Sequence, residues 1–147
     1  MSLSSYEKEI KDAISNLEIE DKIEEFTGEE RRSILQKIQN FFAIGNPRVW
    51  WLSLRYKPES FVFEQEEPYK NITFFFAGEE EVWLVIEDDE QLLYKTNISH
   101  IINIISECSY FEYNIISQNF DRFLCENDHN EFLFVDLRNK SSWSNYL

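Results

Sequence analysis

The spacing of apolar residues changes after Gly45, and this change limits the folds that the chain can adopt. Before that position, large apolar residues recur every three or four positions, which is the spacing of a helix with one buried face. From Val49 onward they alternate with polar residues or form short runs bounded by turn residues, which is typical of strands. The sequence therefore predicts N-terminal helices followed mainly by strands.

Two N-terminal helices are indicated by capping boxes, in which Ser or Thr and a Glu three residues later satisfy backbone N–H groups at a helix start. Ser4 with Glu7 and Thr27 with Glu30 have this spacing. The apolar stripes that follow are Tyr6, Ile10, Ala13, Ile14 and Leu17 in the first helix, and Ile34, Leu35, Ile38, Phe41 and Phe42 in the second. Gly45 is expected to end the second helix.

The rest of the chain is predicted to form strands and one more helix. A tight turn at residues 77–80 predicts a hairpin between the runs 72–76 and 82–86. The isoleucine-rich segment 97–105 has helical spacing and favours a helix, although its β-branched residues also permit a strand. The strand-like runs are residues 49–55, 61–63, 72–76, 82–86, 91–94, 111–116, 120–124 and 131–136.

The first of these runs contains two adjacent tryptophans. Alternation places Trp50, Leu52 and Leu54 on one face of the predicted strand and Trp51 on the other. We therefore expect Trp50 in the core. Trp51 is a candidate binding residue, because a surface aromatic side chain contributes strongly to protein interfaces.

The order of the predicted elements defines a fold class. Sequential hairpins, with helices that do not alternate with every strand, predict an α+β fold: a single mostly antiparallel sheet with the N-terminal helices and one mid-chain helix packed on one face of it. At 147 residues, the chain is expected to form a single globular domain over residues 1–147. Aromatic residues make up 16% of the chain, which is far more than a disordered segment contains.

The charge balance indicates which partners are compatible with the chain. With 28 Asp and Glu against 14 Lys and Arg, the formal net charge is −14 at pH 7. Such a chain repels phosphate backbones and anionic lipids, so we expect neither nucleic acid nor a membrane as a partner. An acidic surface favours a basic protein partner, and it also serves solubility alone.

Several classes of protein are disfavoured by what the sequence lacks. Two cysteines suggest neither a disulfide framework nor a four-ligand zinc site, and the thiols are expected to stay reduced. The N-terminus has no apolar signal region and no stretch has the length of a membrane span, so we expect a cytoplasmic protein. Nucleotide-binding and hydrolase glycine motifs are absent as well.

The stretch FLCENDHNEFLF, residues 123–134, combines a thiol, an imidazole, carboxylates and amides between two apolar runs. Its polar part is expected to be the loop of the last hairpin, because Asn, Asp and His tolerate turn geometry and bond to their own backbone. We therefore interpret it first as a structural turn. Binding contacts are the second interpretation, and the candidate residues are Glu126, Asn127, Asp128 and His129.

Metal binding and catalysis are further interpretations of the same loop. Its spacing is not that of a calcium loop, and it lacks a second His cluster. A nucleophilic Cys125 with His129 or His100 as its base is disfavoured, because burial at an apolar strand end raises the pKa of a thiol. No catalytic residue, metal ligand or cofactor is therefore assigned. The possible metal ligands are Glu126, Asp128, His129 and Glu131.

Two resemblances extend this interpretation. Residues 110–136, YFEYNIISQNFDRFLCENDHNEFLFVD, resemble the C-terminal signature of a group of small uncharacterised bacterial proteins, in which a Cys-Glu-Asn-x-His turn joins two strands. The size, acidity and α+β layout are similar to those of immunity proteins of bacterial toxin systems, including the SUKH type, which bind and block a toxin. The first resemblance implies no activity, and the second implies a protein partner.

Together these observations predict a non-enzymatic cytoplasmic binding protein of immunity or antitoxin type that acts on a basic protein. The alternative is a metal-binding protein or a small metal-assisted hydrolase that uses the loop 126–131. A homo-oligomeric structural protein is a third possibility, since no feature of the sequence fixes the oligomeric state.

Overall fold

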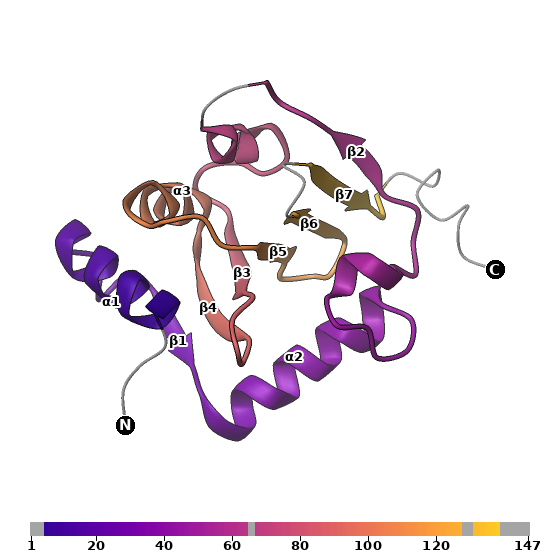
Figure 1. Ribbon diagram of the computed structural model, residues 1–147, viewed down its shortest axis with the longest axis horizontal. Coiled ribbons are helices and arrows are strands. Elements are labelled where there is room, and N and C mark those ends of the chain that lie inside the picture. Colours follow the sequence, from indigo (N-terminus) through magenta and orange to yellow (C-terminus); the bar gives the residue numbers. More distant parts are fainter. Residues whose placement is uncertain (1–4, 65–66, 128–130, 139–147) are drawn as a thin grey trace.

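The computed structural model describes residues 5–64, 67–127 and 131–138. In this part of the chain seven strands form one sheet, with helices on both of its faces (Figure 1), so the predicted α+β class is confirmed. The described helices are α1 (Ser5–Leu17), α2 (Gly28–Phe42) and α3 (Ile98–Glu107), with the 3-10 helices η1 (Trp50–Ser53) and η2 (Pro68–Phe74). The strands are β1 (Glu24–Phe26), β2 (Glu59–Phe61), β3 (Glu81–Ile86), β4 (Leu92–Asn97), β5 (Tyr113–Ser117), β6 (Arg122–Glu126) and β7 (Phe132–Asp136).

The strands follow the order β1-β4-β3-β5-β6-β7-β2, and each neighbouring pair is antiparallel. The pairs β3–β4, β5–β6 and β6–β7 each join strands that are consecutive in the sequence, so sequential hairpins build the centre of the sheet. The mostly antiparallel sheet is therefore confirmed. The edges are the three-residue strands β1 and β2.

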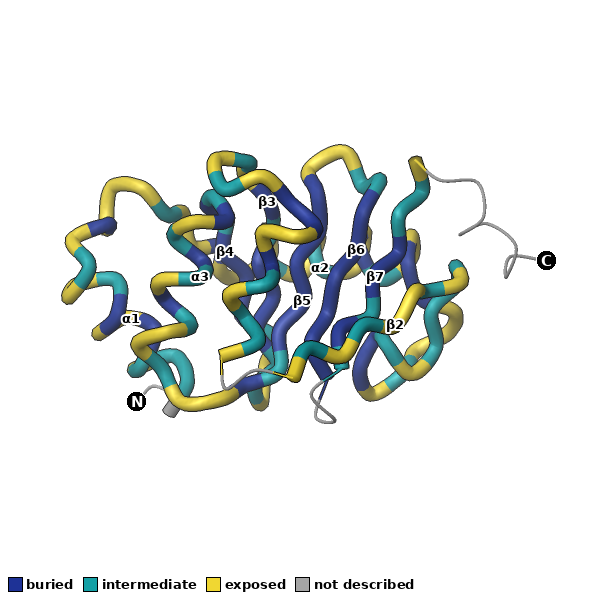
Figure 2. Tube along the Cα trace, turned by 90° about the horizontal axis from the view of Figure 1, so that it is seen from above, coloured by how far each residue is buried: buried dark blue, intermediate teal, exposed yellow. Residues whose placement is uncertain are grey.

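The sheet is covered on both faces, which corrects the expectation that all helices pack on one face. α1, α3 and η2 share a core with one face, and α2 and η1 share a second core with the other (Figure 2). The sequence explains this arrangement, because both faces of the central strands are apolar. In β3, Leu84 and Ile86 enter the first core and Val85 enters the second. A strand buried on both sides needs a layer of helices on each side.

The helices follow the predicted periodicity, but their caps differ from one another. α3 has Asn97 as its N-cap, whose Oδ1 accepts a hydrogen bond from the His100 backbone N–H at 2.9 Å. At the start of α2, Thr27 makes no side-chain cap hydrogen bond, so the second capping box does not form. None of the helices in residues 5–64, 67–127 and 131–138 is both long and apolar enough to cross a membrane.

Two predicted strands are wrong. The run 49–55 contains η1 instead; Trp50 is buried as expected, but Leu52 is 53% exposed. The run 72–76 lies largely in η2, so its hairpin with 82–86 does not form and β3 pairs with β4 and β5. The buried apolar residues of this run are Ile72 in η2 and Phe75 and Phe76 just after its end. Residues at i, i+3 and i+4 lie on one face of a helical turn, so this pattern fits a helix as well as a strand.

Candidate functional site

The ends of three neighbouring strands bring several carboxylates to one end of the sheet. Ile86 of β3 pairs with Tyr113 of β5, which also pairs with Glu126 of β6. The residues around these pairs carry a high density of negative charge, and we call this region the acidic end. Its carboxylates are Glu87, Asp88, Asp89, Glu90, Glu112 and Glu126.

The Cys-Glu-Asn sequence at the end of β6 sends its three side chains to three different environments. Cys125 is 1% exposed in the core beneath α2, and burial raises the pKa of its thiol. Glu126 points to the opposite face because side chains alternate along a strand. Asn127 closes the following loop: its Oδ1 accepts from the Glu131 backbone N–H at 3.2 Å, and its Nδ2 donates to Glu131 Oε1 at 3.0 Å. The local bonding predicted for a structural turn is therefore present at Asn127.

The other candidate residues of this loop, Asp128 and His129, lie outside the described residues. His100 cannot serve as a base for Cys125, because His100 lies on α3 and Cys125 packs beneath α2 on the other side of the sheet. Residues 5–64, 67–127 and 131–138 contain no group of three or more His, Cys, Asp and Glu side chains that could hold a metal ion. The metal interpretation needs Asp128 and His129 as ligands and stays a prediction.

Trp51 lies at the same end of the molecule as Glu126 but on the opposite face of the sheet. Its ring packs at the edge of the core beneath α2, and its Nε1 donates a hydrogen bond to Glu112 Oε1 at 3.2 Å. The ring is partly buried. The structure therefore brings Trp51, Glu126 and Asn127 to one end of the sheet, without placing all three on one surface.

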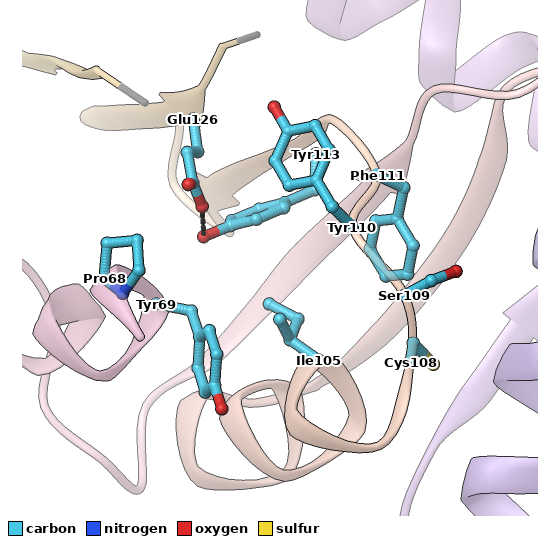
Figure 3. Close-up of a pocket in the computed structure, with 9 residues that line it drawn as sticks. All are labelled: Pro68, Tyr69, Ile105, Cys108, Ser109, Tyr110, Phe111, Tyr113 and Glu126. Carbon is cyan, nitrogen blue, oxygen red and sulfur yellow. Dashed lines mark hydrogen bonds between the residues drawn. The ribbon is translucent and has the colours of Figure 1, made fainter. Parts of the chain in front are cut away.

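A cavity of about 300 Å³ lies beside Glu126, on the face covered by α3 and η2 (Figure 3). It is at the lower end of the size range of small-molecule pockets. Four of its side chains are aromatic, and the wall is formed by η2, the end of α3 and the loop that leads into β5. The residues that line it are Pro68, Tyr69, Ile105, Cys108, Ser109, Tyr110, Phe111, Tyr113 and Glu126.

The floor of this cavity is a buried carboxyl–phenol pair. Glu126 is 4% exposed and Tyr113 is 1% exposed. The Tyr113 hydroxyl donates to Glu126 Oε1 at 2.7 Å, as the dashed line in Figure 3 shows. Burial raises the pKa of the Glu126 carboxyl, and the hydrogen bond from Tyr113 opposes that shift. The charge of Glu126 is therefore poorly solvated and lies where a ligand can reach it.

The other hydroxyl groups around the cavity already donate hydrogen bonds to acceptors of the chain. Each of them therefore offers oxygen lone pairs, and not a proton, to a ligand. Cys108 is a half-buried thiol, and burial raises its pKa to about 11. The hydroxyl bonds are those of Tyr69 to Glu67 Oε2 (2.6 Å), Tyr110 to the Asn127 carbonyl oxygen (2.7 Å) and Ser109 to Glu9 Oε1 (2.8 Å).

Most residues of the cavity were not identified from the sequence. The sequence predicts Glu126 as a binding residue, but it does not indicate that Tyr69, Ile105 and Tyr113 lie beside it. These residues belong to η2, α3 and β5, which are far apart in the sequence and come together only in the tertiary structure. The dense aromatic residues of the segment 110–113 were the one local signal.

The fold and the cavity define a small α+β protein with one antiparallel sheet between two helical layers and a carboxylate-floored aromatic pocket. The chain belongs to the family of unknown function DUF6756, whose family model matches residues 4–144. The predicted membership of an uncharacterised protein family is thereby confirmed. No curated protein and no solved structure matches the chain.

Proposed function

We propose that this protein is a non-enzymatic cytoplasmic binding protein of immunity or antitoxin type, and that its acidic end captures a basic protein. The observation that carries the proposal is the collection of six carboxylates where β3 and β6 end and β5 begins. The excess of acidic residues over the whole chain, with a net charge of −14, adds a long-range attraction for a basic surface.

The carboxylates of Glu87, Glu112 and Glu126 are held in place by hydrogen bonds from neighbouring side chains. Glu87 Oε2 accepts hydrogen bonds from Asn114 Nδ2 at 2.9 Å and from Gln91 Nε2 at 3.0 Å. Burial raises the pKa of Glu87, and the neighbouring Glu112 adds to this shift, while Arg48 opposes it. A cationic group of a partner would stabilise the charged form of Glu87. Because hydrogen bonds already hold this side chain in place, binding would not have to order it first.

The arginines near the acidic end balance only part of its charge. Arg31 Nη2 lies 3.7 Å from Glu90 Oε2, in an ion pair in which the Glu90 side chain is 82% exposed. An exposed ion pair of this kind contributes little to the stability of the fold, so a cation of a partner can take the place of Arg31 beside Glu90. Trp51, fixed by its bond to Glu112, supplies an aromatic surface beside these charges.

The proposal is tested with purified basic bacterial toxin domains, by measuring association rate constants by surface plasmon resonance at several salt concentrations. The exposed Asp89 and Glu90 are changed together to Lys, and the matched control changes the exposed Glu20 and Asp21 to Lys. Both variants change the net charge equally. We expect association to slow by about tenfold or more in the first variant, and much less in the control.

Growth rescue tests the immunity part of the proposal in cells that produce the same toxin. The wild-type chain and the control variant should restore growth, and the Asp89→Lys, Glu90→Lys variant should not. An association rate that does not depend on ionic strength, or an equal loss in both variants, would contradict the role of the acidic end. Thermal unfolding of both variants establishes that they fold.

A further inference from the structure

The cavity beside Glu126 has a consistent chemical character. Glu126 Oε1 accepts the Tyr113 hydrogen bond, and Oε2 accepts none from the described residues. The hydroxyls of Tyr69, Tyr110 and Ser109 already donate elsewhere. Among the described residues that line the cavity, none is Lys, Arg or His. The cavity therefore presents acceptors and aromatic surfaces, and a complementary ligand must supply both hydrogen-bond donors and positive charge.

We propose that this cavity binds a primary alkylammonium group, whose nitrogen bonds to Glu126 and whose alkyl chain packs between Ile105 and the aromatic side chains. This inference does not depend on the proposed function, because a free amine could enter the cavity without any protein docking at the acidic end.

The floor of the cavity explains the preference for a cation. A carboxylate buried to this degree is costly to charge unless a cation or several donors compensate it, and Tyr113 supplies a single donor. An ammonium group would supply the missing charge and two or three further donors. The pKa of Glu126, raised by burial, would fall when the ligand binds.

The walls of the cavity add to the attraction. Cations are stabilised over the faces of aromatic rings, most strongly where water is excluded. The rings of Phe111 and Tyr113 hold each other edge to face with their centroids 6.3 Å apart, so this part of the wall is formed before a ligand arrives. In Figure 3 the carboxylate of Glu126 is directed from β6 toward the Tyr113 hydroxyl, with Pro68 and Tyr69 contributed by η2.

The geometry favours ammonium over guanidinium. A guanidinium group binds a carboxylate best as a fork that uses both oxygens in parallel. Here Oε1 already accepts the Tyr113 hydroxyl, so the fork would compete with an existing bond. An ammonium is a compact charge with three donors and can bind at Oε2 while Oε1 keeps its partner.

The test uses n-butylammonium as the probe in an NMR titration of the full chain. Butyramide and butyrate control for the charge, and butylguanidinium controls for the shape of the cation. We expect saturable shifts at residues of the cavity with butylammonium, weaker binding of butylguanidinium, and no binding of the amide or the carboxylate. A titration in which the amide binds as well as the amine, or in which butylguanidinium binds more tightly, would overturn the assignment.

A pair of isosteric variants separates the cavity from the overall charge. Glu126→Gln keeps an oxygen for the Tyr113 hydroxyl but removes the charge on the floor, and Glu20→Gln makes the same change of net charge at an exposed residue that does not line the cavity. Butylammonium affinity should fall by about tenfold or more in the first variant and stay within about twofold of wild type in the second. Because burial disfavours the charged Glu126, the Glu126→Gln protein should unfold at an equal or higher temperature than wild type, so that lost binding cannot be attributed to lost folding.

The source of the ammonium group is distinguished by a second ligand, a short lysine-containing peptide. A peptide that binds at least about tenfold more tightly than butylammonium, with the same loss in Glu126→Gln, assigns the cavity to a lysine side chain of a partner. Tighter binding of the free amine assigns it to small amines. If neither ligand binds, or if Glu126→Gln binds both as wild type does, the proposal is wrong, and the salt-dependent binding at the acidic end is unaffected by that result.

Discussion

The Tyr113 hydroxyl is expected to stabilise the folded state by solvating the buried carboxylate of Glu126. Tyr113→Phe removes only the oxygen and keeps the packing of the ring. A hydrogen bond to a charged acceptor contributes about 1.5–3 kcal/mol, and here both partners are almost completely buried. The free energy of unfolding should therefore fall by about 1.5–3 kcal/mol near neutral pH. For a chain of 147 residues this corresponds to a melting temperature lower by roughly 3–12 °C.

The cost of Tyr113→Phe should also depend on pH. In the wild-type protein the pKa of Glu126 is raised above its ordinary value by burial, and the Tyr113 bond limits that rise. Without the hydroxyl, the folded-state pKa rises further while the unfolded-state pKa does not change. The folded variant then binds more protons than the unfolded chain over a wider pH range, so its stability falls by a larger total amount as pH rises through that range. The loss should be larger at about pH 8 than at about pH 5.5.

Urea denaturation followed by circular dichroism at these two pH values measures the effect. Tyr110→Phe is the matched control, because the Tyr110 hydroxyl also donates at 2.7 Å, but to the neutral carbonyl oxygen of Asn127, and the residue is 52% exposed. Its cost should be about 0.5–1.5 kcal/mol and independent of pH. A Tyr113→Phe protein as stable as wild type, or one whose loss is the same at both pH values, would refute the role given to this hydrogen bond.

Three further outcomes follow from the contacts. Asn127→Ala should lower the free energy of unfolding by about 0.5–2 kcal/mol, measured by urea denaturation, because the bonds to Glu131 that close the last hairpin are lost; an unchanged midpoint would contradict this. Asn97→Ala should cost about 1 kcal/mol through loss of the α3 cap, whereas Asn97→Asp should retain most of the stability. At about pH 8 roughly one in a thousand Cys108 thiols is ionised, given its pKa of about 11, so iodoacetamide should label it slowly and Cys125 only after unfolding; rapid labelling of folded Cys125 would show that its burial is misjudged.

The elements that could be predicted from the sequence are those with long, one-sided periodicity. α2 and α3 each present an apolar stripe over several turns, and both lie where the spacing placed them. The runs 49–55 and 72–76 failed because a few adjacent aromatic residues fit a helical turn as well as a strand. β1 has the sequence Glu-Glu-Phe and pairs with β4 because tertiary neighbours supply a partner, and such a strand carries no local signal.

The candidate site was only partly accessible from the sequence for a related reason. The sequence places Glu126 in a polar loop, whereas in the structure its side chain is buried at the end of β6. The strand alternation that separates it from Cys125 follows directly from the sequence once the strand is known. The cavity wall does not, because Tyr69 and Ile105 reach Glu126 only after η2 and α3 pack on the same face of the sheet.

The short edge strands have a consequence for the behaviour of the protein in concentrated solution. An exposed strand edge is a template for pairing with another molecule, and β1 and β2 limit that template to three residues each. The exposed Glu24, Glu25 and Glu59 lie on these strands. Lys95 and Lys11 form ion pairs with Glu24 and Glu25, but the net charge of −14 still makes two copies that approach edge to edge repel each other. Near the isoelectric point of about 4.5 this repulsion weakens as carboxylates become protonated. Self-association through the sheet edges is therefore suppressed at neutral pH and becomes possible on acidification.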